Sequence, residues 1–351
     1  LKFKVWSVSM PHRPFIYFIL PSLLSMILLI AVPVFSVIVQ SFFVEHEQVL
    51  IEVENCNPFK CVKSLSVDQQ AGAKLRQEAP LGRFNGINTY TNRNHLAFDE
   101  VALAWMESKS LVDFGAKLLN LPFYKALLFT LTYTFIVSPF VLIFGLAIAL
   151  GVNGLPKFVK GPSIFVSLLP MIVTPLIGSL ILFWMIDAKG ILGATLQLIF
   201  DDNNLSLKAS MPLTWVMLIV YGIWHSTPFA FIVLYAGLQT VPQETLEAAS
   251  IDGATRWERI RHVAVPHMVP LIIFITLMQL MDNFRVFEPI VGFSASAKAT
   301  SLSWIIFNDL HGDSKLFGSA AASSIMTIIG VMILLMPVLI RSWKNFNIKL
   351  H

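Results

Sequence analysis

Charged residues are scarce in this chain. Asp, Glu, Lys and Arg together make up 13% of its 351 residues, about half the share that is usual in soluble domains. Hydrophobic residues make up 56%, and the mean hydropathy is +0.71. A soluble fold of this composition would lack the polar surface that keeps a protein dispersed. The composition therefore excludes an ordinary soluble domain and indicates that the chain folds in a lipid bilayer.

Sequence motifs of catalytic chemistry are also missing. The chain has no Gly-x-x-x-x-Gly-Lys-Ser/Thr phosphate loop, no His-Glu-x-x-His metal motif and no Gly-x-Ser-x-Gly nucleophile elbow. These absences argue against a membrane-embedded enzyme, and they imply that any ATP is bound by another chain. We expect no metal, no cofactor and no nucleic-acid partner for this chain.

Six charge-free stretches are long enough to span a bilayer, which takes roughly 20 apolar residues. They contain 31, 31, 26, 35, 20 and 25 residues: 14–44, 126–156, 161–186, 209–243, 262–281 and 316–340. No small-residue cleavage site follows the first stretch, so we expect it to be retained as a helix. The sequence therefore predicts an all-α integral membrane protein with six transmembrane helices.

Lys and Arg residues predict the orientation of these helices. Eleven of them fall on one side of the membrane: Lys2, Lys4, Arg13, Lys157, Lys160, Arg256, Arg259, Arg261, Arg341, Lys344 and Lys349. Because basic residues of short loops favour the cytoplasm, this side, with both termini, is predicted to be cytoplasmic. We expect a cytoplasmic N-terminus and first helix in 1–43, an external loop in 44–125, five helices in 126–345 and a cytoplasmic tail in 346–351.

The external loop holds the only two cysteines, Cys56 and Cys61. A pair this close in an oxidising compartment is typical of a local disulfide, and two free thiols are the alternative. Further ligands for a zinc site do not lie nearby in the sequence. The loop is small for an independent core, so we expect it to pack on the membrane domain.

The cytoplasmic loop 241–266 has the pattern of two short helices around a glycine. Pro242 suits a first helical turn, and Gly253 suits the left-handed position that ends a helix. Thr255 and Glu258 have the spacing of a capping box that begins a second helix. A small-faced helix at the membrane surface suits insertion into a groove of a partner. An ordinary amphipathic interfacial segment is the alternative.

One signature in this loop resembles a known family. Glu247-Ala-Ala-Ser-Ile-Asp-Gly-Ala254, followed by Val265-Pro266, is similar to the EAA loop of ABC importer permeases. Other motifs resemble the carbohydrate-uptake class, with the larger maltose-type permeases as an example: Leu169-Pro170, Trp224 before Pro228, and Gly318 with Ala320 to Ala322. The resemblance covers roughly residues 125–345. Residues 291–298 depart from the Thr-Gly-Gly-Pro run of many relatives, which leaves the outer loop and the substrate type open.

The resemblance implies a function, partners and a location. The EAA helix of the family sits in a cleft of a cytoplasmic ATPase. ATPase-coupling roles are therefore implied for six residues: Glu247, Ala248, Ala249, Asp252, Gly253 and Ala254. The implied partners are a homologous second permease, two ATPase subunits that bind ATP and Mg, and an external substrate-binding protein. The implied function is the translocation of a sugar, oligosaccharide or sugar derivative across the bacterial cytoplasmic membrane.

Polar residues at the end of the fifth predicted helix indicate a solute pathway. Asp282, Arg285 and Glu288 are spaced to lie near one helix face, where they form either an ion ladder or a ligand site. Matching motifs with the maltose-type permeases places substrate contacts at six residues: His225, Ser226, Phe229, Gln279, Asp282 and Asn283. A helix-packing role is the alternative for the histidine. Arg285 is the candidate to recognise an acidic sugar or a phosphate.

A secondary transporter driven by an ion gradient is the competing interpretation. That class would predict inverted repeats and carboxylates near the bilayer midplane. The sequence has no clear repeat, and the EAA-like loop would be unexplained in such a protein. ATP-driven import is therefore the favoured hypothesis.

Overall fold

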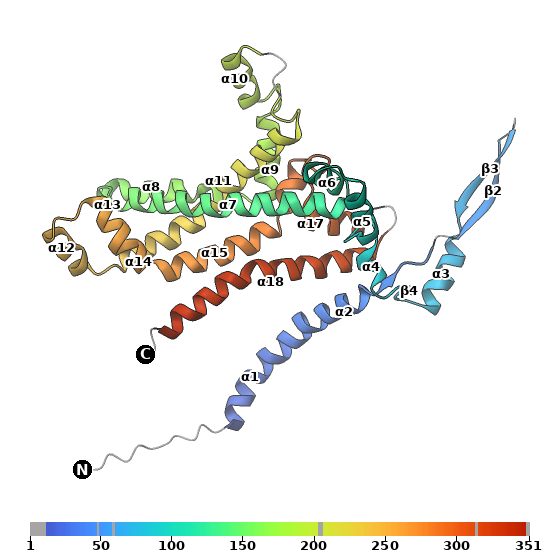
Figure 1. Cartoon of the computed structure of the whole chain (residues 1–351), viewed down its shortest axis with the longest axis horizontal. Helices are drawn as coiled ribbons and strands as arrows, with labels where there is room; N and C mark the ends of the chain where they lie inside the picture. Colours follow the sequence, from blue (N-terminus) through green and yellow to red (C-terminus); the bar gives the residue numbers. More distant parts are fainter. Residues whose placement is uncertain (1–11, 48, 58–59, 203–205, 313–314, 349–351) are drawn as a thin grey trace. The chain divides into compact units, whose positions relative to one another are not determined.

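The structure is a computed structural model that describes residues 12–47, 49–57, 60–202, 206–312 and 315–348. These residues are mostly helical and form two compact units. The first unit lies within residues 1–91 and 309–325, and the second lies within residues 92–308 and 326–351. All six charge-free stretches of the sequence contain helices (Figure 1).

The first unit contains one apolar helical stretch and two small antiparallel sheets. Its elements are α1 (His12–Met26), a π-helical turn (Ile27–Ala31), α2 (Val32–Gln40), β1 (Phe43–Val44), β2 (Leu50–Asn57), β3 (Lys60–Val67), α3 (Gln69–Glu78), β4 (Arg83–Phe84), α4 (Asn88–Thr91) and the start of α18 (Phe317–Ile348). The stretch Phe15–Gln40 is long and apolar enough to cross a membrane. Its large apolar side chains are exposed, as a lipid-facing helix requires.

Strands in the predicted external loop depart from the all-helical expectation. The sequence of β2 alternates apolar and acidic residues, which is the pattern of a strand. β1 pairs with β4 so that the rings of Phe43 and Phe84 meet edge to face, with centroids 5.5 Å apart. β2 pairs with β3 in a register that sets Cys56 opposite Cys61. The side chains of both cysteines lie outside the described part of the structure, so their disulfide stays a prediction.

The second unit is a helical bundle. Its elements are α5 (Phe98–Glu107), α6 (Leu111–Leu118), α7 (Pro122–Asn153), α8 (Lys157–Ile172), α9 (Pro175–Met185), α10 (Ile191–Phe200), α11 (Met211–Gln239), α12 (Gln243–Ile251), α13 (Arg256–Arg259), a π-helical turn (Ile260–Ala264), α14 (Val265–His267), α15 (Val269–Phe284), α16 (Glu288–Gly292), α17 (Leu302–His311) and the end of α18. α11 packs along α7 and α8, and α15 packs along α7 (Figure 1). The long helix α7 is therefore central to the bundle.

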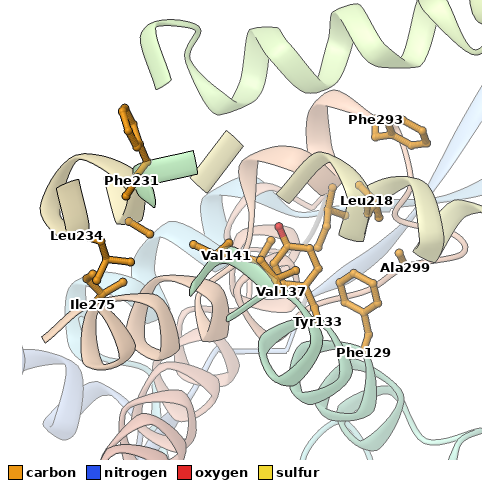
Figure 2. Close-up of a cluster of buried hydrophobic side chains, with 14 of the residues drawn as sticks. Phe129, Tyr133, Val137, Val141, Leu218, Phe231, Leu234, Ile275, Phe293 and Ala299 are labelled. Carbon is orange, nitrogen blue, oxygen red and sulfur yellow. The ribbon is translucent and has the colours of Figure 1, made fainter. Parts of the chain in front are cut away.

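The core of this bundle lies between α7, α11 and α15. Figure 2 shows the buried side chains that meet there, among them Phe129, Val137 and Val141 of α7, Leu218, Phe231 and Leu234 of α11, and Ile275 of α15. Small residues allow the close approach of α7 and α11. A Cβ added at Gly145 would lie 2.7 Å from the Cβ of Ala230. Helices in a bilayer commonly associate through such small-residue contacts.

Two of the predicted membrane spans are broken helices. Among the described residues, four helices are long and apolar enough to cross a membrane, and the number rises to six if each bent pair is one span. α8 and α9 meet at an angle of 92°, and Arg256–His267 meets α15 at 70°. The first break ends at Thr174, whose ψ of 145° is extended because the next residue is a proline. The second break falls at Met268, two residues before Pro270, which cannot donate a backbone hydrogen bond.

The loops after α9 and α16 are tied together by side chains. Lys208 forms an ion pair with Asp187 at 2.7 Å, and this hydrogen bond holds the pKa of Asp187 below its usual value. Lys298 donates to the carbonyl of Lys208, while the indole of Trp215 donates to the carbonyl of Lys298 at 2.9 Å. Ser294 has a left-handed φ of 51° at the end of α16. The segment that departs from the family's glycine-rich run therefore makes a left-handed turn at Ser294.

Close packing of α16 on α9 makes a prediction about stability. A Cβ added at Gly292 would lie 2.1 Å from Oγ of Ser179, so Gly292→Ala should lower the free energy of unfolding by about 1–3 kcal/mol through overpacking. Gly151, in α7, has no such neighbour within 4 Å. The control Gly151→Ala should leave stability unchanged or raise it by up to about 1 kcal/mol. Thermal unfolding of the purified protein in detergent measures both. Equal unfolding temperatures for the two variants would contradict the packing argument.

Candidate functional site

The break between α8 and α9 presents two backbone carbonyls, of Val173 and Pro175, to α11. Two side chains of α11, one turn apart, reach them. Nε2 of His225 lies 3.1 Å from the carbonyl oxygen of Val173, and the hydroxyl of Tyr221 donates to the carbonyl of Pro175 at 2.9 Å. The two rings stack with centroids 5.8 Å apart. Because unsatisfied carbonyls are costly in a bilayer, these contacts stabilise the broken span.

A cavity of about 490 Å³ opens beside this break. It lies between α7, α9, α11 and the turn that joins α15 to α16. Its lining consists of Tyr133, Pro175, Tyr221, Gly222, His225, Ser226, Asp282, Asn283, Arg285, Val286, Phe287, Glu288 and Pro289. Hydroxyl, imidazole, amide, guanidinium and carboxylate groups therefore converge on one space in an otherwise apolar bundle.

Five of the seven residues that the sequence proposed as substrate contacts line this cavity: His225, Ser226, Asp282, Asn283 and Arg285. The other two do not. Gln279 is only 5% exposed and lies one turn behind Asn283 in α15. Phe229 faces Phe274, with ring centroids 6.4 Å apart. Substrate contact thus remains a prediction for all seven, and the structure places two of them away from the cavity.

The expectation of one charged helix face is wrong for Glu288. α15 ends at Phe284, and Glu288 begins the separate helix α16. The first pair of the expected ladder does form. Nη2 of Arg285 lies 3.0 Å from Oδ1 of Asp282, and both side chains are 55% exposed. The turn after α15 nevertheless brings Glu288 to the same cavity as this pair.

The amides in α15 are engaged in helix packing. Nδ2 of Asn283 donates to Oγ of Ser138 in α7 at 3.0 Å and to Oε1 of Gln279 at 3.2 Å. All three residues are buried. Buried polar groups that satisfy one another in this way fix the position of one helix against the next. The amide of Asn283 therefore borders the cavity and also joins α15 to α7.

Sequence reasoning missed the two tyrosines of the cavity, Tyr133 and Tyr221. Tyr133 comes from α7, which no motif had singled out. A Cβ added at Gly222 would lie 2.1 Å from its hydroxyl oxygen, so the glycine provides the room for this phenol. The sequence did carry a signal for Tyr221, since it stands one helical turn before His225. Only the packing of α7 against α11 brings Tyr133 beside them.

The loop between α11 and α15 has the predicted form of two helices around a glycine. α12 ends at Ile251, and Gly253 has a left-handed φ of 84°. The amide of Ala254 bonds the carbonyl of Ala249 at 3.0 Å, and that of Gly253 bonds Ser250, a Schellman turn. Pro242 precedes α12 as its N-cap, one residue before the expected position.

The capping box that the sequence predicted is present. The Thr255 hydroxyl accepts from the amide of Glu258 at 3.3 Å, and the Glu258 carboxylate accepts from the Thr255 amide at 2.7 Å. Nη1 of Arg259 donates to Oγ of Ser250 at 3.0 Å and thereby joins α13 to α12. The two short helices are thus joined, and the chain continues through the π-helical turn and α14 to α15.

The surface of α12 is open. Glu247, Ala248, Asp252 and Gly253 are exposed, and Ala249 and Ala254 are half-buried. Ile251 is 87% exposed, an unusual position for a large apolar side chain. Figure 1 shows α12 beyond the ends of α7, α8, α11 and α15, at one end of the bundle. This geometry suits insertion into a partner, although it does not test the six residues one by one.

Known proteins are similar to parts of this chain. The trehalose/maltose transport system permease protein MalF of Thermococcus litoralis is 33% identical over 140 residues, which are 36% of this chain and 46% of that protein. The match thus spans less than half the length of this relative. The sn-glycerol-3-phosphate transport system permease protein UgpA of Agrobacterium fabrum is 29% identical over 229 residues, 62% of this chain and 75% of that protein.

A solved structure supports the fold. The crystal structure of a bacterial ABC transporter involved in the import of the acidic polysaccharide alginate superposes with a TM-score of 0.57 at 20% identity. The superposition covers 74% of this chain and 87% of that chain. Residues 115–343 also match the family described as the binding-protein-dependent transport system inner membrane component. Because this match covers more than half of the chain, the protein belongs to that family of inner membrane components.

Proposed function

We propose that this chain is a permease subunit of an ATP-driven importer and that its cavity is part of the pathway for a sugar, oligosaccharide or sugar derivative. The observation that carries the proposal is the convergence of polar side chains on a cavity of about 490 Å³ among apolar helices. Polar groups at such depth are costly in lipid and commonly mark a solute pathway. Hydroxyl-rich solutes need this mixture of donors and acceptors.

The proposed partners follow from the family and from the open surface of α12. They are a homologous second permease, two cytoplasmic ATPase subunits that bind ATP and Mg, and an external substrate-binding protein. The relatives named above transport trehalose and maltose or sn-glycerol 3-phosphate, by their names. In this proposal the six EAA residues, from Glu247 to Ala254, contact the ATPase.

A continuous segment of chain connects the proposed ATPase contact with the cavity. α12 is joined to α13 by the Arg259–Ser250 hydrogen bond, and α13 leads through the π-helical turn and α14 into α15. The far end of α15 carries Asp282 and Asn283 at the cavity. We propose that a displacement of α12 by the ATPase moves α15 and thereby alters access to the solute. The bend at Met268 is the point where this segment changes direction.

The proposed function is tested by uptake in a bacterial host that lacks the chain. Radiolabelled trehalose, maltose, glucosamine, sn-glycerol 3-phosphate and a uronate oligosaccharide form the panel. Restoring the chain with its partners should restore uptake of at least one of them, and this uptake should require ATP and the external binding protein. It should persist when an ionophore removes ion gradients at constant ATP. Loss of uptake under that treatment would support a secondary transporter instead.

Coupling is tested by two variants in the α12 turn. Gly253→Pro should abolish uptake at unchanged membrane abundance, because proline requires a φ of about −65° where the structure has +84°. Glu247→Arg should do the same by reversing an exposed charge at the proposed ATPase contact. The control Glu107→Arg, also exposed but in α5, should leave uptake unchanged. Normal uptake by both α12 variants would exclude the coupling role.

Substitutions at two neighbouring residues of α15, Asp282 and Asn283, distinguish a solute contact from a packing contact. The Asp282–Arg285 pair is half exposed, so Asp282→Asn should lower the free energy of unfolding by less than about 1 kcal/mol. Membrane abundance should therefore change little, while uptake falls several-fold. Asn283→Ala should lower abundance, since it leaves Ser138 and Gln279 without a buried hydrogen bond, at a cost of about 1–3 kcal/mol. Abundance and uptake are measured in the same cells. A loss of abundance that accounts for all lost uptake in Asp282→Asn would remove it from the pathway.

A further inference from the structure

The charges around the cavity are unequal. Among the residues that the structure describes, two carboxylates, Asp282 and Glu288, and one guanidinium, Arg285, line it. The guanidinium is paired with Asp282 at 3.0 Å. The carboxylate of Glu288 is therefore left without a basic side chain of its own in this lining. The arginine that the sequence offered as a receptor for an acidic group already has an anionic partner.

This imbalance matters for an anionic solute. Asp282 and Arg285 are each 55% exposed, but two like charges in direct contact repel even where solvent partly screens them. A phosphate or uronate group in the cavity would face Glu288 while Arg285 stays bound to Asp282. A sugar hydroxyl, by contrast, donates readily to a carboxylate oxygen.

The phenol of Tyr133 is a second, independent feature of the same cavity. This residue is only 3% exposed and packs among apolar side chains of the core (Figure 2), yet it lines the cavity. Within the described part of the chain, its hydroxyl has no hydrogen-bond partner of the kind that Tyr221 has in the carbonyl of Pro175. Because this hydroxyl opens on the cavity, it is suited to bonding a solute hydroxyl. Gly222 leaves the space for it.

We propose that Glu288 and Tyr133 determine the specificity of the cavity and that they select a sugar unit without an anionic group. In this arrangement a solute hydroxyl donates to the Glu288 carboxylate, and another accepts from, or donates to, the Tyr133 hydroxyl. The inference rests on the proposed function and restricts its substrate class. It separates this chain from relatives named for an anionic solute, such as sn-glycerol 3-phosphate.

The first test uses the uptake panel described above. Chain-dependent uptake should be found for trehalose, maltose or glucosamine, and not for sn-glycerol 3-phosphate or the uronate oligosaccharide. Uptake confined to the two anionic probes would overturn this inference and leave the proposed sugar import intact. An absence of chain-dependent uptake across the whole panel would overturn the proposed function and, with it, this inference.

The second test isolates this chain from the selectivity of the binding protein. Binding of the imported sugar and of its 6-phosphate ester is measured on the purified full-length chain in nanodiscs. The neutral sugar should bind about ten-fold more tightly than its ester, because the ester meets Glu288. Glu288→Gln should narrow this ratio several-fold. Tyr133→Phe should weaken the binding of both the sugar and its ester about five-fold and leave the ratio of their affinities unchanged.

Matched controls keep the result specific. Glu107→Gln removes an exposed carboxylate in α5. Tyr124→Phe removes a phenol that does not line the cavity and that donates to the carbonyl of Leu96 at a distance of 2.8 Å. Both should bind the two probes as the wild type does. Equal binding of sugar and ester by the wild-type chain, an unchanged ratio in Glu288→Gln, or no binding of the imported sugar would each overturn the assignment.

Discussion

Backbone carbonyls at the break between α8 and α9 are contacted by two side chains of α11. Within a bilayer no water is available to satisfy such groups, so irregular backbone persists only where protein surrounds it. His225 and Tyr221 meet this requirement at Val173 and Pro175. The break turns α9 away from α8 by 92° and leaves room beside α11. The polar cavity lies beside this break, and its lining includes Pro175 of α9 together with Tyr221 and His225 of α11.

This constraint gives some residues two roles. His225 borders the cavity and also contacts the Val173 carbonyl, so it has a packing contact, while its contact with a solute stays a prediction. Asn283 likewise borders the cavity while it joins α15 to Ser138 of α7. Residues with a packing role cannot be assigned to solute by loss of uptake alone. Asp282 and Glu288 are better probes, because each is exposed to the cavity and neither forms a buried contact between helices.

The α12–α13 segment is built differently from the rest of the bundle. Its shape depends on local bonds: a left-handed glycine, a capping box and the Arg259–Ser250 contact. Such bonds preserve a fixed shape without a hydrophobic core, and they leave Ile251 and Glu247 exposed. A rigid, exposed segment joined directly to α15 is suited to pass a displacement from a partner to the cavity.

The sequence by itself determined the features that depend on local chemistry. Charge-free runs located the helices, and the pattern of Gly253, Thr255 and Glu258 located the two short helices and their cap, because these bonds join residues only a few positions apart. The tertiary structure alone decided that the proposed residues of α11 and α15 share one cavity and which further residues complete it. Tyr133 reaches it only because α7 packs on α11, and Glu288 reaches it only because α15 ends at Phe284 and the chain turns. The hairpin register of Cys56 and Cys61 also depends on pairing between strands. Contacts between segments far apart in the chain depend on how the helices pack, and the periodicity of one segment does not predict that packing.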